Sequence, residues 1–214
     1  LDLSCWKVAF NGAEPVRSET LQRFAAEFED SRFRPSAFRP CYGLAETTLF
    51  VSASEGSADL AGRAFDAEAL ANNRVKSSRS KDARIFIACG HPDPDQEIRI
   101  VSPDTLKLCS PIQVGEIWIK GPNIAQGYWN QPEKSAETFR ARIAGSDDGP
   151  FLRTGDLGFL KEGELFITGR LKDLLIIRGR NHYPQDIELT VERSDSVLLA
   201  GSGAAFSVEV QGEE

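Results

Sequence analysis

The apolar residues of the chain fall into short runs whose spacing predicts several strands. Residues 6–10 and 174–177 are nearly continuous apolar runs, which indicates buried strands. Residues 98–100, 115–121 and 205–210 alternate apolar with polar side chains, as half-buried strands do. Residues 159–167 contain two such runs joined at Gly163 and predict a hairpin.

Between these strands, helical spacing predicts three helices. Ser18 is expected to cap the first, whose apolar positions are Leu21, Phe24, Ala25 and Phe28. Proline at the first helical position predicts a second helix from Pro132 to Phe139 and a third opening at Pro184. Pro35 and Pro40 are expected to bracket a connector. Strands interspersed with helices predict an α/β fold in layers.

Composition narrows the possible functions. The 214 residues include 41% hydrophobic ones, which excludes a mainly disordered chain, and they carry a net charge of −7. We therefore expect no nucleic-acid partner. The longest aliphatic run, residues 174–177, is far too short to span a bilayer, so we expect no stable membrane insertion. The four cysteines lie far apart and form no CxxC pair, which favours reduced thiols and a cytoplasmic location. Because the sequence contains no Met, we also expect it to be an excerpt of a longer chain.

Residues 52–84 differ from the rest of the chain because they are small, polar and basic. Their basic residues are interspersed with serines: Arg74, Lys76, Arg79, Lys81 and Arg84. Such a stretch can contact a nucleic acid or a carrier protein. No aromatic residue is interleaved to stack on bases, so a solvated surface insertion is the favoured interpretation.

Two short segments carry residues suited to a nucleotide. Tyr42 offers a ring for stacking, Gly43 lets a backbone approach closely, and Glu46 can hold a divalent cation together with phosphates. Asp156, which follows Thr154-Gly155, can accept hydrogen bonds from ribose hydroxyls. Each segment alone is also a common surface turn.

The order of the motifs carries more information than any one of them. Taken together, they strongly resemble the successive core motifs of the adenylate-forming superfamily, which includes acyl-CoA synthetases, firefly luciferase and the adenylation domains of nonribosomal peptide synthetases. The resemblance covers essentially the whole chain. The motifs are residues 11–15 (Asn-Gly-Ala-Glu-Pro), 42–46 (Tyr-Gly-Leu-Ala-Glu), 115–117 (Gly-Glu-Ile), 127–129 (Gly-Tyr-Trp), 154–156 (Thr-Gly-Asp) and 169–173 (Gly-Arg-Leu-Lys-Asp).

Within that superfamily the chain most resembles a fatty acyl-AMP ligase. The sequences of residues 179–188 and 43–52 match that branch. In addition, 44 positions separate Glu46 from Gly90, and this interval is shorter in CoA-forming relatives. The surplus coincides with the polar segment 52–84. The resemblance implies activation of a fatty acid by Mg²⁺ and ATP as an acyl adenylate, followed by transfer to the phosphopantetheine of an acyl carrier protein. A fatty acyl-CoA ligase, or a non-catalytic remnant that binds nucleotide or a carrier protein, stays an alternative.

The resemblance also assigns roles to individual residues. It implies an adenine pocket largely of backbone, a stacking tyrosine beside a glycine, a magnesium ligand, two ribose contacts and a hinge. Ala45 departs from the pattern, because many relatives carry a phosphate-contacting Thr there. The adenine pocket is implied at Gly12, Ala13 and Glu14, the stacking tyrosine and its glycine at Tyr42 and Gly43, and the magnesium ligand at Glu46. The ribose contacts are implied at Asp156 and Arg170, and the hinge at Lys172.

The same resemblance divides the chain into two parts. Residues 1–170 are expected to be the later part of the large N-terminal domain, with mixed sheets, helices and a small β-rich subdomain. Residues 172–214 are expected to begin the small, mobile α+β C-terminal domain. The phosphate loop is then expected upstream of Leu1 and the catalytic Lys beyond Glu214, so we expect the fragment itself to be inactive. With half of the large domain absent, partial exposure is expected for Phe10, Phe24, Phe28 and Trp118.

Overall fold

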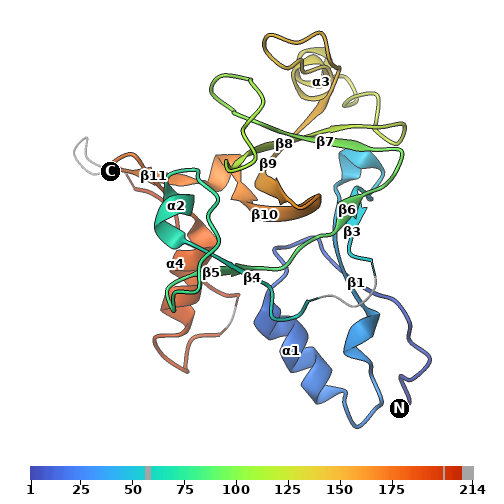
Figure 1. Ribbon diagram of the computed structural model, residues 1–214, viewed down its shortest axis with the longest axis vertical. Helices are drawn as coiled ribbons and strands as arrows, with labels where there is room; N and C mark the ends of the chain where they lie inside the picture. Colours follow the sequence, from blue (N-terminus) through green and yellow to red (C-terminus); the bar gives the residue numbers. More distant parts are fainter. Residues whose placement is uncertain (56–58, 200, 209–214) are drawn as a thin grey trace.

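A computed structural model describes residues 1–55, 59–199 and 201–208 of the chain (Figure 1). Its helices are α1 (Ser18–Glu27), α2 (Ala67–Ala71), α3 (Pro132–Phe139) and α4 (Pro184–Glu192). Its strands are β1 (Ala9–Asn11), β2 (Phe38–Tyr42), β3 (Ser52–Ala53), β4 (Arg63–Phe65), β5 (Arg84–Phe86), β6 (His91–Pro92), β7 (Glu97–Val101), β8 (Gly115–Lys120), β9 (Leu152–Lys161), β10 (Glu164–Arg170), β11 (Leu175–Ile177) and β12 (Arg180–His182). The α/β class predicted from the sequence is confirmed.

One sheet has the order β1-β2-β3-β6 and begins with a parallel pair. Ala9 pairs with Phe38, and Asn11 pairs with Pro40. The apolar face of α1 covers this pair, since Leu21 packs in one buried cluster with residues of both strands. Because β1 and β2 are parallel, the segments that follow them leave from the same edge of the sheet. In α/β sheets this edge is where ligands bind.

The other large sheet, β10-β9-β8-β7, is antiparallel throughout and is covered on both faces. One face packs in a cluster that includes Tyr42 and Val51 from the first sheet region and Phe139 of α3. The opposite face packs against Phe65 and Leu70. This double coverage explains why residues 115–119 of β8 are all buried. Burying both faces also fixes the register of each strand.

The β9–β10 hairpin has a tight turn and an irregular far end. Glu162 and Gly163 both have positive φ, 56° and 82°, as a two-residue hairpin turn requires. Farther along, the register shifts between Ile167 and Gly169, so that Thr168 is an extra residue in β10. After this bulge Arg170 lies opposite Asp156.

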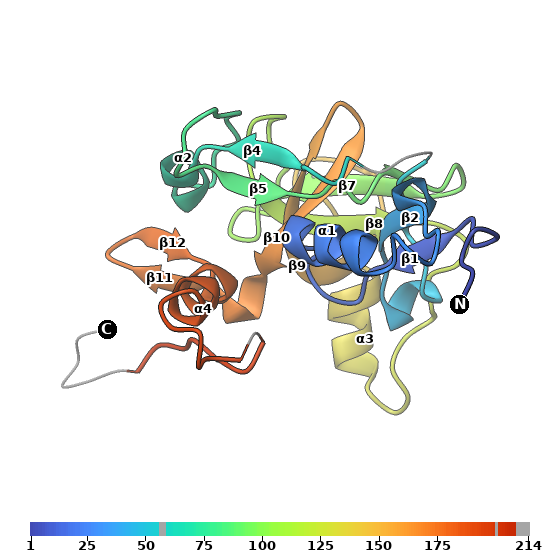
Figure 2. The ribbon, with the colours of Figure 1, turned by 90° about the horizontal axis from the view of Figure 1, so that it is seen from below.

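The last described segment lies at one side of the molecule, where β11, β12 and α4 are next to α2 and the β4–β5 pair (Figures 1 and 2). The guanidinium of Arg84 in β5 lies over the ring of Tyr183, 4.4 Å from its centroid, and makes a 2.7 Å ion pair with Asp186 of α4. Segment 63–86 is therefore in direct contact with the segment after residue 180. None of the described helices is long and apolar enough to cross a membrane.

Several local predictions are confirmed. The helix predicted from Pro132 to Phe139 has these bounds in the structure, and the hairpin and the strands predicted within residues 98–100 and 115–121 are present. Phe10 is 64% exposed, and Phe24 and Phe28 are partly exposed, as expected.

Other local predictions were wrong. Residues 6–8 are not part of β1, and the expected connector between Pro35 and Pro40 becomes β2 from residue 38 onward. Ser18 does not cap α1. It is the first helical residue, and its hydroxyl contacts the carbonyl of Leu60 instead. Residues 205–208 form no strand, and the rest of that predicted strand, 209–210, lies outside the described residues.

Two expectations about burial were also wrong. Trp118 is fully buried, because Val101, Ile143 and Phe151 enclose it within the chain itself. The segment 52–84 is more than a solvated surface insertion, because Phe65 and Leu70 are fully buried against the antiparallel sheet. Its polar composition conceals these two core residues.

Candidate nucleotide-binding site

Tyr42, Asp156 and Arg170 meet at one place although they are far apart in the sequence. They end β2, lie within β9 and end β10, respectively. The hydroxyl of Tyr42 donates a 2.6 Å hydrogen bond to Oδ2 of Asp156. Nε of Arg170 lies 3.2 Å from Oδ1 of the same carboxylate. The three residues to which the resemblance assigns contacts with one nucleotide are thus neighbours in the structure, while their individual roles stay predictions.

The carboxylate at the centre of this cluster is largely buried, with Asp156 only 8% exposed. Burial raises its pKa, and the Tyr42 hydroxyl and the Arg170 guanidinium act in the opposite direction. Burial, reinforced by the adjacent carboxylate, raises the pKa of Tyr42 well above 10, which keeps its hydroxyl a donor at neutral pH. Arg170 is mostly exposed and can contact a ligand from the solvent side.

The loop after β1 lies beside this cluster. A side chain at Gly12 would come within 2.9 Å of both the carbonyl oxygen and the Sγ of Cys41, the residue before Tyr42. Ala13 adopts a left-handed φ of 70°, and Ala13 and Glu14 are exposed. Their backbone is thus accessible next to Tyr42, as an adenine pocket built from backbone requires. Tyr42 itself is 9% exposed and packs in the core on one side.

The turn after β2 depends on Gly43. A Cβ there would lie 1.6 Å from the carbonyl oxygen of Leu49, so a larger residue would displace the backbone. The carbonyl of Leu44 closes the turn by accepting hydrogen bonds from the amides of Thr47 and Leu49, each at 3.0 Å. This closed turn holds Glu46 at a defined position.

Glu46 has a partner that the sequence analysis did not identify. The hydroxyl of Tyr128 donates a 2.7 Å hydrogen bond to Oε1 of Glu46, and the amide of Ala125 donates to the Glu46 backbone carbonyl at 2.8 Å. Burial and this carboxylate raise the pKa of Tyr128 to about 12, so its hydroxyl stays protonated. The signal was available, because Tyr128 belongs to the quoted motif at residues 127–129.

The donor set around Glu46 fits a magnesium ion held mostly by phosphates. Within the described residues, no three His, Cys, Asp or Glu side chains form a group that could enclose a metal. Mg²⁺ is commonly held by only one or two carboxylates together with substrate phosphates and water. One oxygen of Glu46 is hydrogen-bonded to Tyr128, and its carboxylate is only partly buried.

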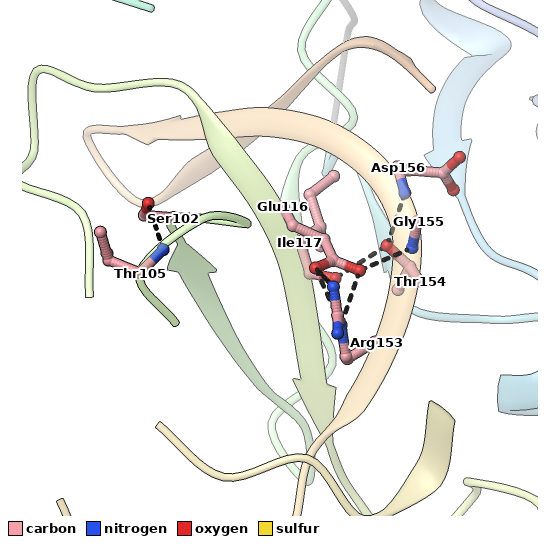
Figure 3. Close-up of polar contacts among 8 residues, drawn as sticks. All are labelled: Ser102, Thr105, Glu116, Ile117, Arg153, Thr154, Gly155 and Asp156. Carbon is pink, nitrogen blue, oxygen red and sulfur yellow. Dashed lines mark hydrogen bonds and ion pairs between the residues drawn. The ribbon is translucent and has the colours of Figure 1, made fainter. Parts of the chain in front are cut away.

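A buried ion pair fixes the turn that carries Asp156 (Figure 3). Glu116 of β8 is 2% exposed, and it accepts hydrogen bonds from Nε and Nη2 of Arg153 at 3.0 and 2.9 Å. The same carboxylate accepts the amide of Gly155 at 3.1 Å. The Thr154 hydroxyl donates to the Ile117 carbonyl and accepts the amide of Asp156. Sequence analysis missed this support, although Glu116 lies in a quoted motif.

Lys172, the expected hinge residue, is exposed in a single 3₁₀ turn (Leu171–Asp173) directly after β10. It lies two residues from Arg170, yet no described contact joins it to Tyr42 or Asp156. Two cavities lie elsewhere. One, of about 180 Å³, is lined by residues including Ala67, Arg84, Asn181 and Tyr183; the other, of about 470 Å³, by residues 94–97 and 120–122. The polar cluster around Asp156 is therefore a separate feature.

Comparison with known proteins decides the family. The AMP-binding enzyme family matches residues 1–129. The chain belongs to this family.

Three similar proteins show where this AMP-binding enzyme lies within the family. The chain is 53% identical over 218 residues to the medium-chain-fatty-acid–[acyl-carrier-protein] ligase JamA of Moorena producens, covering 100% of this chain and 37% of that protein. It is 45% identical over 209 residues to the putative fatty-acid–CoA ligase fadD21 of Mycobacterium bovis, covering 95% and 35%.

The third is a solved structure from studies of fatty acyl-adenylate ligases of E. coli and L. pneumophila. It superposes with a TM-score of 0.84 at 37% identity and covers 96% of this chain and 36% of that one. The chain thus spans little more than a third of the length of these relatives. The resemblance to adenylate-forming enzymes and fatty acyl-AMP ligases is confirmed, and the mixed α/β fold matches part of such a ligase.

Proposed function

We propose that this chain is part of a ligase that activates a fatty acid as its acyl adenylate with ATP and transfers the acyl group to the phosphopantetheine of an acyl carrier protein. Residues 1–170 would then be the later part of the large domain, and residues 172–214 the start of the small one. The catalytic Lys is expected beyond Glu214.

The observation that carries this proposal is the cluster of Tyr42, Asp156 and Arg170 in an AMP-binding enzyme. A buried carboxylate with a fixed orientation is a suitable acceptor for two ribose hydroxyls. The neighbouring arginine, being mostly exposed, can reach the same sugar. The activities named for similar proteins, a fatty-acid–[acyl-carrier-protein] ligase and fatty acyl-adenylate ligases, support the acyl substrate and the carrier acceptor.

Formation of an acyl adenylate requires mainly that the protein position the reactants and stabilise charge. Gly12, Ala13 and Glu14 line the adenine through backbone, and Tyr42 presents its ring beside them. Asp156 and Arg170 hold the ribose and so orient the α-phosphate. Mg²⁺ bound at Glu46 would neutralise phosphate charge. Lys172 is the residue about which the small domain turns between the two half-reactions.

The first test is fatty-acid-dependent exchange of pyrophosphate into ATP, measured on the full-length ligase that contains this chain. We expect exchange with the parent and at least a tenfold higher KM for ATP in Asp156→Asn, since a hydrogen bond to a charged group typically contributes about 1.5–3 kcal/mol and about 1.4 kcal/mol corresponds to tenfold in affinity. Arg140→Glu, on the exposed end of α3, is the matched control and should behave as the parent. Absence of exchange in the parent would favour the remnant that binds without catalysis.

A fatty acyl-CoA ligase is the second candidate, and similarity to the putative fatty-acid–CoA ligase of Mycobacterium bovis favours it. CoA and holo-carrier protein should be compared as acceptors. Deleting residues 55–80 would also remove the buried Phe65 and Leu70, so a smaller change is preferable. Arg84→Leu breaks the ion pair to Asp186 while keeping an apolar side chain over Tyr183. If segment 52–84 restrains the small domain, CoA transfer should rise in this variant. Efficient acyl-CoA synthesis by the unchanged parent would contradict the acyl-AMP assignment.

A further inference from the structure

Two basic segments of this acidic protein lie next to each other. Residues 72–84 contain five basic residues and one acidic residue, against 25 basic and 32 acidic residues in the whole chain. The turn between β11 and β12 adds Arg178 and Arg180. We call the exposed members of these segments the basic surface. They are Arg74, Lys76, Arg79, Lys81, Arg178 and Arg180.

Direct contacts hold the two segments together. The side-chain amide of Asn181 in β12 donates a 2.7 Å hydrogen bond to Oδ1 of Asn73. Arg180 lies 3.9 Å from Glu68 of α2, the helix that precedes residues 72–84. Figures 1 and 2 both show α2 beside the β11–β12 hairpin. Residues 68–73 and 180–181 are therefore in direct contact, which brings the two basic segments next to each other.

The backbone beneath this surface is anchored to the antiparallel sheet region. The amide of Val75 donates to the carbonyl of Ile112 at 2.7 Å, and the amide of Val114 donates to the carbonyl of Asn73 at 3.0 Å. Arg74 pairs with Gln113 in an isolated bridge. Charges on an anchored backbone lose less freedom on binding than charges on a loose tail.

Most of the positive charge is available to a partner. Within the described residues, Arg74, Arg79, Lys81 and Arg178 make no ion pair. Lys76 is 3.7 Å from Asp66 but mostly exposed, and such a pair contributes little. Exposed Ile112 lies in the segment that anchors residues 73–75, exposed Ile176 lies in β11, and both can add apolar contact.

The surface spans the proposed hinge. Residues 74–81 precede Lys172, and Arg178 and Arg180 follow it. A partner that touches both groups is sensitive to how the two parts are arranged, which is a property needed in the acyl-transfer step. The segment lacks interleaved aromatic residues, which disfavours a single-stranded nucleic acid.

We infer that the basic surface docks the acidic face of the acyl carrier protein during transfer. This inference rests on the proposed function. Complementary charges across such an interface act mainly on the encounter rate and so on the KM for the carrier. The reaction of the bound acyl adenylate with a small thiol has no need of this surface.

The test uses the full-length ligase and the double variant Arg79→Glu/Lys81→Glu. A holo-acyl carrier protein of acidic isoelectric point is one acceptor, and free pantetheine, which has no protein surface, is the other. Two charge reversals should raise the KM for the carrier by about tenfold or more, as loss of electrostatic steering does. Pyrophosphate exchange and acylation of pantetheine should stay within twofold of the parent. Added NaCl should raise the carrier KM of the parent more than that of the variant.

The control is Arg140→Glu, a charge reversal at the exposed residue that directly follows α3, a helix that lies away from α2 (Figures 1 and 2). An unchanged carrier KM in the double variant would overturn the inference, as would an equal rise with Arg140→Glu or with pantetheine. Binding of a labelled single-stranded RNA that is lost in the double variant, with an unchanged carrier KM, would assign the surface to nucleic acid instead. If the parent shows no exchange at all, the proposed function itself fails and takes this inference with it.

Discussion

The hydroxyl of Tyr42 donates a hydrogen bond to the carboxylate of Asp156 across 114 positions of sequence. This bond joins the end of a parallel strand pair to the antiparallel sheet, and so it connects the two sheets at the candidate site. It also sets the electrostatics of the carboxylate, because it opposes the effect of burial on its pKa.

Replacing Tyr42 with Phe should shift the acid limb of the pH profile. Burial raises the pKa of Asp156, and the Tyr42 hydroxyl lowers it. Without the hydroxyl the pKa rises further, so Asp156 becomes protonated at a higher pH and stops accepting two hydrogen bonds from a ribose. The acid limb of kcat/KM for ATP, which reports the free enzyme, should therefore move to higher pH. Tyr183→Phe, at a buried tyrosine without a described bond to Asp156, is the control. If the acid limb is unchanged in Tyr42→Phe, the assignment of Asp156 as the ribose-binding carboxylate is contradicted.

Removing the Tyr128 hydroxyl should weaken magnesium-dependent ATP binding. Tyr128→Phe keeps the ring, whose centroid is 5.1 Å from that of Phe139, and removes only the bond that orients Glu46. Loss of a partner that orients a metal ligand typically costs about 10–100-fold in metal affinity or activity. We expect the Mg²⁺ concentration for half-maximal exchange to rise, with the fatty acid KM unchanged. An equal rise in the Mg²⁺ requirement and in the fatty acid KM would instead indicate a general disturbance of the fold.

Breaking the ion pair beneath the Asp156 turn should destabilise the protein. Arg153→Leu leaves the Glu116 carboxylate buried without its charged partner, which typically costs about 3–5 kcal/mol. Arg153 also lies 5.6 Å above the ring of Trp118, so the fluorescence of this buried indole should report the change. The double variant Glu116→Gln/Arg153→Leu removes the stranded charge and should recover part of the loss. Thermal unfolding of the three proteins tests this order.

A methyl group at Gly43 should displace the turn that carries Glu46. The new Cβ meets the backbone carbonyl of Leu49, which cannot rotate away as a side chain can. We expect Gly43→Ala to raise the KM for magnesium ATP by about tenfold or more, as misplacement of a site by roughly 1 Å does. Gly145→Ala is the matched control. Its φ is +81°, but no atom lies within 4 Å of the added Cβ, so only a modest loss of stability should follow.

Sequence patterns predicted the elements whose signals are local. The β9–β10 hairpin and α3 follow from turn chemistry and a first-turn proline, and both are present. The convergence of Tyr42, Asp156 and Arg170 came from the order of family motifs and not from periodicity. Each motif alone could equally well be interpreted as an ordinary turn, so only the combination of motifs indicated a nucleotide-binding site.

What sequence reasoning missed depends on contacts between distant segments. Trp118 lies on a strand whose second face is covered by residues far along the chain, so alternation alone could not reveal its burial. Phe65 and Leu70 are core residues in a segment whose average composition is polar. Tyr128 bonds to Glu46, and Arg153 bonds to Glu116. Each bond joins two segments that are far apart in the sequence, and no local sequence pattern predicts that these segments are neighbours in space.

The bulge at Thr168 determines which residue faces Asp156. Continuing the regular pairing from Ile167 and Gly158 would place Arg170 opposite Gly155, with its side chain on the reverse side of the ribbon. The bulge absorbs the surplus Thr168, and so Arg170 stays opposite Asp156 with its guanidinium toward the carboxylate. Loss of the Thr168 codon would consequently straighten β10 and leave the arginine facing the same carboxylate, whereas one residue added after the bulge would turn it to the reverse side.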